Sequence, residues 1–159
     1  MSLTIQKLSL SALTISALAL SPLALSHFDD KEMQQSYRQS WFALVASNFG
    51  PIVASVKGEI PWNQAAIEGW GNDLAALATL NTQRGFTEGS DKGTTRAKPE
   101  IWQNKEDFES KMRDMKNALA DLQEATAGGD KATIGKQVGA TGEACKACHD
   151  EYKAKNYLY

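Results

Sequence analysis

The chain of 159 residues has little of what marks the specialised protein classes. Its two cysteines are too few for a disulfide scaffold, and it has only four prolines and no low-complexity tract. The net charge of −2 gives no electrostatic reason to expect a nucleic acid or an acidic membrane surface as a partner. With 42% hydrophobic and 23% charged residues, the composition is that of an ordinary globular protein of one domain.

The first 26 residues differ from the rest of the chain. Lys7 is their only charged residue, and an apolar run follows it and ends in a small-x-small tripeptide. This pattern is typical of a secretory signal peptide. A transmembrane anchor is the alternative, but serine and threonine interrupt the run and Pro22 breaks its end. We therefore expect residues 1–26 to be removed and residues 27–159 to be an exported domain with no membrane attachment.

Four later segments have apolar residues at intervals of three and four, which predicts amphipathic helices. No segment has the alternation of a strand. We therefore predict an all-α protein, an antiparallel up-down four-helix bundle. The expected helices and their end signals are residues 31–57 with Gly58 as the stop, 61–80 with Pro61 in the first position, 104–128 ended by Gly128-Gly129, and a last helix capped by Asp130 and reaching Tyr152.

A polar segment with three glycines, residues 81–100, separates the second and third expected helices. A loop of about 20 residues inside a compact domain is usually functional or tightly packed. Phe86 is its one large aromatic side chain ahead of the next helix, so we expect it to be buried under the loop.

Both cysteines lie near the end of the chain, in the motif Cys145-Lys146-Ala147-Cys148-His149. This spacing matches the attachment motif of a c-type haem. Residues three apart lie on one side of a helix, so both thiols can add to the two haem vinyl groups. The adjacent His149 is then the expected axial ligand of the iron. The motif predicts one covalent haem c, attached on the last helix of the bundle.

Three alternatives compete with haem. Chance produces this arrangement of two cysteines and a histidine with odds on the order of one in several thousand. A redox dithiol is expected at a helix N-terminus, whereas about 15 residues of helical pattern precede Cys145. Zinc usually takes four ligands, and His27 is the only other histidine or cysteine after residue 26.

The position of the motif, on the last helix of a four-helix pattern, points to a family. The chain resembles cytochrome c′, a class II cytochrome c, over essentially all of residues 27–159. The segments that carry the resemblance are Tyr37-Arg38-Gln39-Ser40, Val56-Lys57-Gly58, Pro99-Glu100-Ile101-Trp102, and Cys145-Lys146-Ala147-Cys148-His149-Asp150 with Tyr152.

The signal peptide and the covalent haem attachment together predict a periplasmic location. The resemblance implies a haem pocket built from Arg38, Gln39, Phe42 and Phe86. It places Phe42 over the distal face of the iron, where low-spin relatives carry methionine. It places Arg38 and Gln39 at the haem edge, where a guanidinium can bind a propionate. Periodicity alone predicts that Phe42 is simply an aromatic residue of the hydrophobic core. Lys153 stands where many relatives have arginine, and a lysine lacks the planar guanidinium.

A phenylalanine cannot ligate iron, so we expect a five-coordinate, high-spin site that binds nitric oxide or carbon monoxide. The alternative is a periplasmic single-electron carrier with a redox protein partner. A haem peroxidase is the third reading, but it needs a distal acid–base group that Phe42 does not supply. We therefore expect no enzyme activity. Relatives often form homodimers through the first two helices, where Trp41, Trp62 and Trp70 are candidate contacts unless they are buried in the core.

Overall fold

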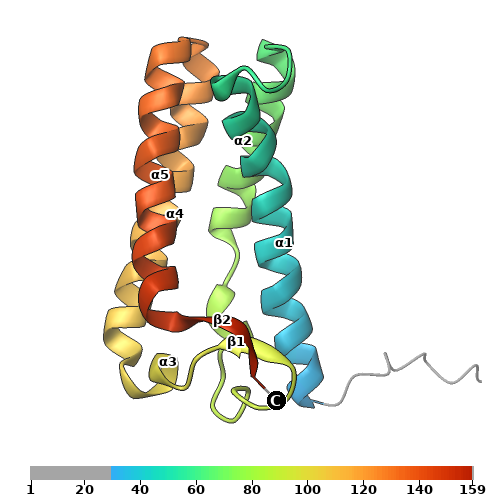
Figure 1. The fold of residues 1–159 in the computed structure, drawn as a ribbon, viewed down its shortest axis with the longest axis vertical. Coiled ribbons are helices and arrows are strands. Elements are labelled where there is room, and N and C mark those ends of the chain that lie inside the picture. Colours follow the sequence, from blue (N-terminus) through green and yellow to red (C-terminus); the bar gives the residue numbers. More distant parts are fainter. Residues whose placement is uncertain (1–29, 159) are drawn as a thin grey trace, which may run out of the picture.

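The computed structural model describes residues 30–158, with side chains from Met33 onward. The expected signal peptide and His27 lie outside these residues. Four long helices form an antiparallel bundle, and the smaller elements lie at one of its ends (Figure 1). The long helices are α1 (Asp30–Lys57), α2 (Gln64–Thr79), α4 (Lys105–Gly128) and α5 (Lys131–Tyr152). The prediction of an all-α four-helix bundle is confirmed.

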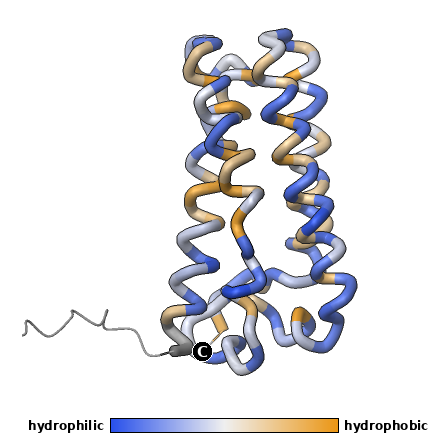
Figure 2. The backbone as a smooth tube through the Cα atoms, turned by 180° about the vertical axis from the view of Figure 1, so that it is seen from behind, coloured by the Kyte–Doolittle hydropathy of each residue, from blue (hydrophilic) through white to orange (hydrophobic). Residues whose placement is uncertain are grey.

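The predicted apolar stripes form one continuous core between these helices. Hydrophobic and hydrophilic segments alternate along each helix (Figure 2), as expected when one face of each helix is buried. The most deeply buried side chains include Ile52, Ile67, Leu74, Leu119, Leu122 and Ile134. No helix within residues 30–158 is long and apolar enough to cross a membrane.

Most of the predicted helix ends are correct. Gly58 and Gly129 have φ angles of 77° and 72°, a left-handed conformation that glycine adopts without strain, and each follows the end of a helix. The Asp130 carboxylate accepts a hydrogen bond from the Thr133 amide at 2.7 Å and caps α5. The prediction that Pro61 begins the second helix is wrong. Asn63 is the N-cap, and its side chain accepts from the Ala66 amide at 3.1 Å.

The prediction of no strands is also wrong. The chain between α2 and α4 contains a short 3-10 helix η1 (Thr82–Gly85), strand β1 (Thr95–Ala97) and helix α3 (Glu100–Gln103). Strand β2 (Lys153–Leu158) follows α5 and pairs antiparallel with β1. Both strands are too short and too polar for an alternating pattern, and they exist because the tertiary fold brings their backbones together.

The loop of residues 81–100 is held by the buried side chain of Arg38 on α1. Its guanidinium donates to the Gly85 carbonyl at 2.9 Å and to the Ser90 hydroxyl and carbonyl at 3.1 and 2.9 Å. A fourth hydrogen bond, 2.7 Å long, runs to the Thr95 hydroxyl. Phe86 lies between these acceptors in sequence and is buried, which confirms the expectation for that residue. One side chain of α1 thus positions η1, Phe86 and β1 together.

Gly71 allows α2 to approach α4 closely. A Cβ atom at this position would lie 2.1 Å from the Thr126 hydroxyl of α4, far inside contact distance. Gly69, one half-turn earlier on the same helix, has no atom within 4 Å of the corresponding point. Both glycines are helical, but only the position of Gly71 lacks space for a side chain.

We expect Gly71→Ala to lower the free energy of unfolding by about 1–3 kcal/mol, because the added methyl group overpacks the α2–α4 contact. Gly69→Ala is the matched control and should raise it by about 0.5–1 kcal/mol through helix propensity. Urea unfolding followed by circular dichroism measures both. Equal effects of the two substitutions would contradict the close approach at Gly71.

We expect Arg38→Met to lower the free energy of unfolding by about 2–4 kcal/mol, because it removes four buried hydrogen bonds to the loop. Arg84→Met is the control. The exposed Arg84 lies against the Tyr37 ring, with its guanidinium carbon 5.6 Å from the ring centroid, so its loss should cost below about 1 kcal/mol. A similar destabilisation by both variants would contradict the role of Arg38 as the residue that holds the loop.

Candidate functional site

The last two turns of α5 carry the three chemically distinctive residues of the chain. Cys145 and Cys148 are free thiols three positions apart, as one face of a helix requires. Cys148 is buried at 8% exposure within the core, and the half-buried Cys145 packs against that core. The adjacent His149 is exposed. The helix therefore turns both thiols toward the aromatic interior of the bundle.

The thiols have the wrong acidity for a redox dithiol. Burial raises the pKa of Cys145, and burial together with the neighbouring Cys145 raises the pKa of Cys148 to about 11. A catalytic dithiol needs a lowered thiol pKa, usually at a helix N-terminus, whereas these cysteines lie near the C-terminal end of α5. The environment disfavours the dithiol alternative.

His149 is in a setting that keeps its imidazole uncharged. Although the residue is exposed as a whole, the protein around the imidazole partly desolvates it and lowers the pKa of His149, and the positive charges of Lys153 and Arg96 lower it further. A histidine must be neutral to ligate a metal ion. The protonation state of His149 therefore suits the role of an axial ligand.

A series of aromatic rings links α1 to the end of α5. Phe42 on α1 packs edge-on against Trp41 and Phe86, with ring centroids 4.9 and 6.5 Å apart. Phe86 packs against Phe108 of α4 at 4.8 Å, and Phe108 against Tyr152 of α5 at 5.3 Å. The sequence expectation named Phe42 and Phe86, and the fold brings these two rings together in the same cluster as the cysteines.

Tyr152 and Asp107 form a contact at this end of the bundle that sequence reasoning missed. The Tyr152 hydroxyl donates to the Asp107 carboxylate and joins α5 to the first turn of α4. The hydrogen bond lowers the pKa of Asp107, while desolvation and this carboxylate raise the pKa of Tyr152 to about 12. No sequence signal links two residues 45 positions apart, because only the helix pairing makes them neighbours.

Arg38 and Gln39 occupy different environments despite being adjacent. Arg38 is 4% exposed, its four recorded hydrogen bonds go to uncharged oxygens, and its guanidinium carbon lies 5.5 Å from the Phe86 ring centroid. Burial lowers the pKa of Arg38 to about 10, so it is still a cation at neutral pH. Gln39 is exposed and donates to the Thr94 carbonyl at 3.4 Å. The terminal nitrogens of Arg38 thus bind loop oxygens, while its guanidinium packs beside the aromatic cluster.

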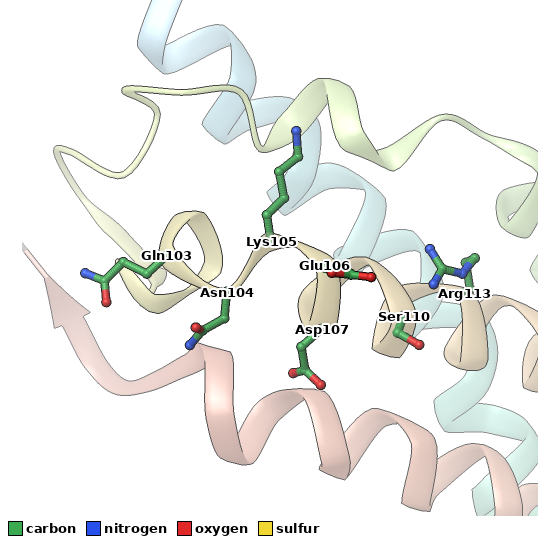
Figure 3. A pocket seen from close by; sticks show the side chains of 7 residues that line it. All are labelled: Gln103, Asn104, Lys105, Glu106, Asp107, Ser110 and Arg113. Atoms are coloured by element: carbon green, nitrogen blue, oxygen red, sulfur yellow. The ribbon is translucent and has the colours of Figure 1, made fainter.

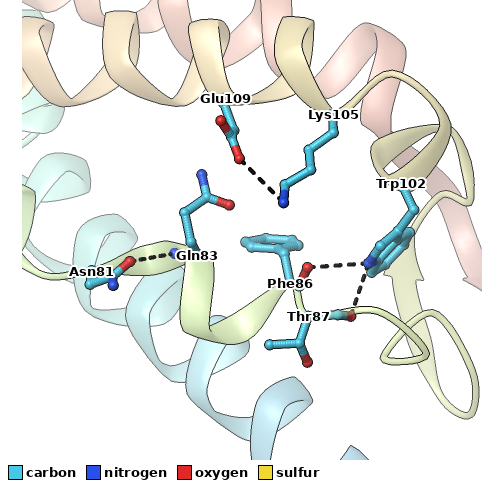
Figure 4. Close-up of polar contacts among 7 residues, drawn as sticks. All are labelled: Asn81, Gln83, Phe86, Thr87, Trp102, Lys105 and Glu109. Atoms are coloured by element: carbon cyan, nitrogen blue, oxygen red, sulfur yellow. Dashed lines mark hydrogen bonds and ion pairs between the residues drawn. The ribbon is translucent and has the colours of Figure 1, made fainter.

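Trp102 of α3 fixes the loop that carries Phe86. Its indole N–H donates to the carbonyls of Thr87 at 2.9 Å and Phe86 at 3.2 Å (Figure 4). A cavity of about 380 Å³ lies against Phe86, Phe108, Ile101 and Trp102, with Lys105 at its edge. A second depression, lined only by polar side chains, covers the α3–α4 junction (Figure 3) and contains neither cysteine nor histidine.

The methionines divide as their positions in the sequence suggest. Met112 and Met115 are buried in the core at 2% and 4% exposure, while Met33 in α1 is 54% exposed. Within residues 33–158, no group of three or more histidine, cysteine, aspartate or glutamate side chains is arranged to hold a metal ion.

These residues fit a covalently attached haem. The donor set consists of two free thiols facing an aromatic core and a neutral imidazole in the next position. A buried guanidinium lies against the same aromatic cluster.

Comparisons with known proteins agree with this fit. The family described as Cytochrome C' matches residues 33–153. Cytochrome c' of Cereibacter sphaeroides is 33% identical over 129 residues, which cover 79% of this chain and 86% of that protein. The solved cytochrome c prime of Shewanella frigidimarina has a TM-score of 0.76 and 39% identity, covering 80% of this chain and 99% of the other.

A nitric oxide complex of a cytochrome c prime variant from Alcaligenes xylosoxidans is also similar. Its TM-score is 0.73 at 34% identity, and the match covers 81% of this chain and 99% of that one. The shared fold, the matched family and the CxxCH motif lead to one conclusion. The chain belongs to the cytochrome c′ family and is a covalent haem c protein.

Proposed function

We propose that this protein is an exported haem protein whose iron is five-coordinate and high-spin and binds nitric oxide and carbon monoxide. Cys145 and Cys148 carry the haem, and His149 is its single protein ligand. The haem supplies an iron atom with an open coordination position, and the residues of the chain determine what reaches it. The protein acts by binding a gas, in nitric oxide scavenging or transport, and not as an enzyme.

The observation that carries the proposal is the aromatic wall formed by Phe42 and Phe86. Both rings belong to the cluster against which Cys145 and Cys148 pack, and neither offers a lone pair to a metal. The ring of Phe42 excludes water and larger ligands, and a diatomic molecule enters only when the ring moves. Arg38 holds the loop behind Phe86, and its Nε–H, which these loop bonds do not use, is the donor we propose for a propionate.

The choice of ligand follows from the same wall. Nitric oxide and carbon monoxide bind ferrous haem without a hydrogen-bond donor, whereas bound oxygen gains much from one. Phe42 and Phe86 have no polar hydrogen to donate. The nitric oxide complexes of cytochrome c prime variants from Alcaligenes xylosoxidans support this choice, since those proteins are 34% identical to this chain.

We also propose that the protein acts in the periplasm and forms a homodimer through α1 and α2. The signal-like residues 1–26 support export. Leu44 on α1 is 51% exposed and would lie in this interface. A similar solved cytochrome c' is described as showing ligand-controlled dimer dissociation. Trp41 is buried in the core and is not available for this contact, while Trp62 and Trp70 are half-buried.

We expect mass spectrometry of the periplasmic protein to show one haem that survives acid–acetone extraction. His149→Ala should keep this attachment, because both thiols remain, but should abolish the native absorption spectrum of the iron. Glu143→Gln is the control, since Glu143 is an exposed carboxylate on the same helix, and its spectrum should be that of the wild type. An unchanged spectrum in His149→Ala would show that another residue ligates the iron.

We expect Phe42→Ala to accelerate carbon monoxide association with the ferrous protein about tenfold or more, since removing the ring lowers the barrier by ~1.4 kcal/mol or more. Phe49→Ala is the matched control, a half-buried aromatic on the same helix two turns away, and should change the rate little. Phe42→Met should convert the iron to a six-coordinate, low-spin state. Flash photolysis and absorption spectra measure these effects.

A wild-type spectrum that is low-spin and six-coordinate in both oxidation states would contradict the five-coordinate site. That result would favour the single-electron carrier, because a sixth protein ligand closes the gas site while still permitting electron transfer.

A further inference from the structure

The chain continues beyond the helix that carries His149. β2 begins at Lys153, directly after the last residue of α5, and pairs with β1 from the loop between α2 and α3. The two strands lie across the end of the bundle at which α5 finishes (Figure 1). The small sheet is therefore the element that receives the backbone following His149.

Main-chain hydrogen bonds hold the last turn of α5. The amide of Lys153 donates to the carbonyl of His149 at the C-cap. The amide of Lys98, directly after β1, donates to the carbonyl of Tyr152 at 3.0 Å. Two of the carbonyls that a helix leaves without partners at its C-terminus are thereby satisfied.

The side chain of Arg96 binds the backbone of β2. Its Nε donates to the carbonyl of Ala154 at 2.8 Å, and its Nη2 donates to the carbonyl of Lys155 at 2.6 Å. The planar guanidinium thus binds two consecutive carbonyls of β2 in one fixed geometry. These bonds add to the pairing of β2 with β1.

β1 is itself fastened to α1. The Thr95 hydroxyl accepts from the Arg38 guanidinium at 2.7 Å and from the amide of Ala97 at 3.1 Å. Arg38 lies one turn before Phe42 on α1. The sheet therefore connects the helix that presents Phe42 to the residues that follow His149.

We propose that Arg96 is a positioning residue that, by holding β2, fixes the last turn of α5 and so orients the His149 imidazole toward the haem iron. The final turn of a helix frays when its carbonyls lack partners, and a side chain on a fraying turn samples several directions. The contacts of β1 and β2 remove that freedom. The inference rests on the proposed role of His149 as the axial ligand.

The test is resonance Raman spectroscopy of the ferrous, haem-loaded protein, which detects the iron–histidine stretching band directly. We expect Arg96→Met to broaden this band and move it to lower frequency, because a loosely held imidazole bonds less strongly. Arg113→Met, the same substitution at an exposed position of α4, should leave the band as in the wild type. Arg96→Lys keeps one charged donor and should give an intermediate shift.

The outcomes separate the proposal from its premise. Arg96→Met with a lower melting temperature and an unchanged iron–histidine band would overturn the positioning role and leave Arg96 a stabilising residue only. Absence of the band in the wild-type protein would overturn ligation by His149 instead. Should Arg96→Met fail to fold, Arg96→Lys decides: a shifted band supports the positioning role and a wild-type band overturns it.

Discussion

The buried guanidinium of Arg38 is the interaction on which the functional end of the bundle depends. A charged group at 4% exposure is tolerated only when its hydrogen-bonding capacity is used, and here the bonding oxygens all come from one loop. Satisfying this one side chain therefore imposes the path of the loop. The path places Phe86 against Phe42 and brings β1 to the end of α5. The hydrogen bonds of Arg38 thus determine how the aromatic rings are arranged.

The aromatic cluster transmits that order across the bundle. Edge-on contacts run from Phe42 through Phe86 and Phe108 to Tyr152, and each ring comes from a different element. Offset and edge-on arrangements are the preferred geometries of aromatic pairs, so the rings restrict one another's orientation. The two thiols of α5 pack against the same cluster. The rings and the thiols thus form an environment that suits a flat macrocycle.

The two faces of this site have different chemistry for a physical reason. The side toward α1 presents rings that carry no lone pair, whereas the last turn of α5 presents a neutral imidazole beside Lys153 and Arg96. In the proposed site, the rings exclude ligands and the imidazole supplies one. The difference arises because the rings come from α1 and its neighbouring loop, whereas the imidazole comes from the last turn of α5. This difference is the basis of the proposed gas selectivity.

The four helices, most of their ends and the covalent haem could be predicted from the sequence. Helical periodicity and the Cys145–His149 spacing are local patterns, so they can be read along the chain. The burial of Phe86 was also predicted, because a large aromatic side chain in a polar loop is stabilised by packing against the core. Pro61 was misread as a helix start because Asn63, two residues later, supplies the capping oxygen. The tertiary structure alone decided the strands, the acceptors of Arg38 and the pairing of Tyr152 with Asp107. These contacts join residues 45 or more positions apart, and hydrogen bonds over such separations depend on where the helices place the backbone, which no local pattern encodes.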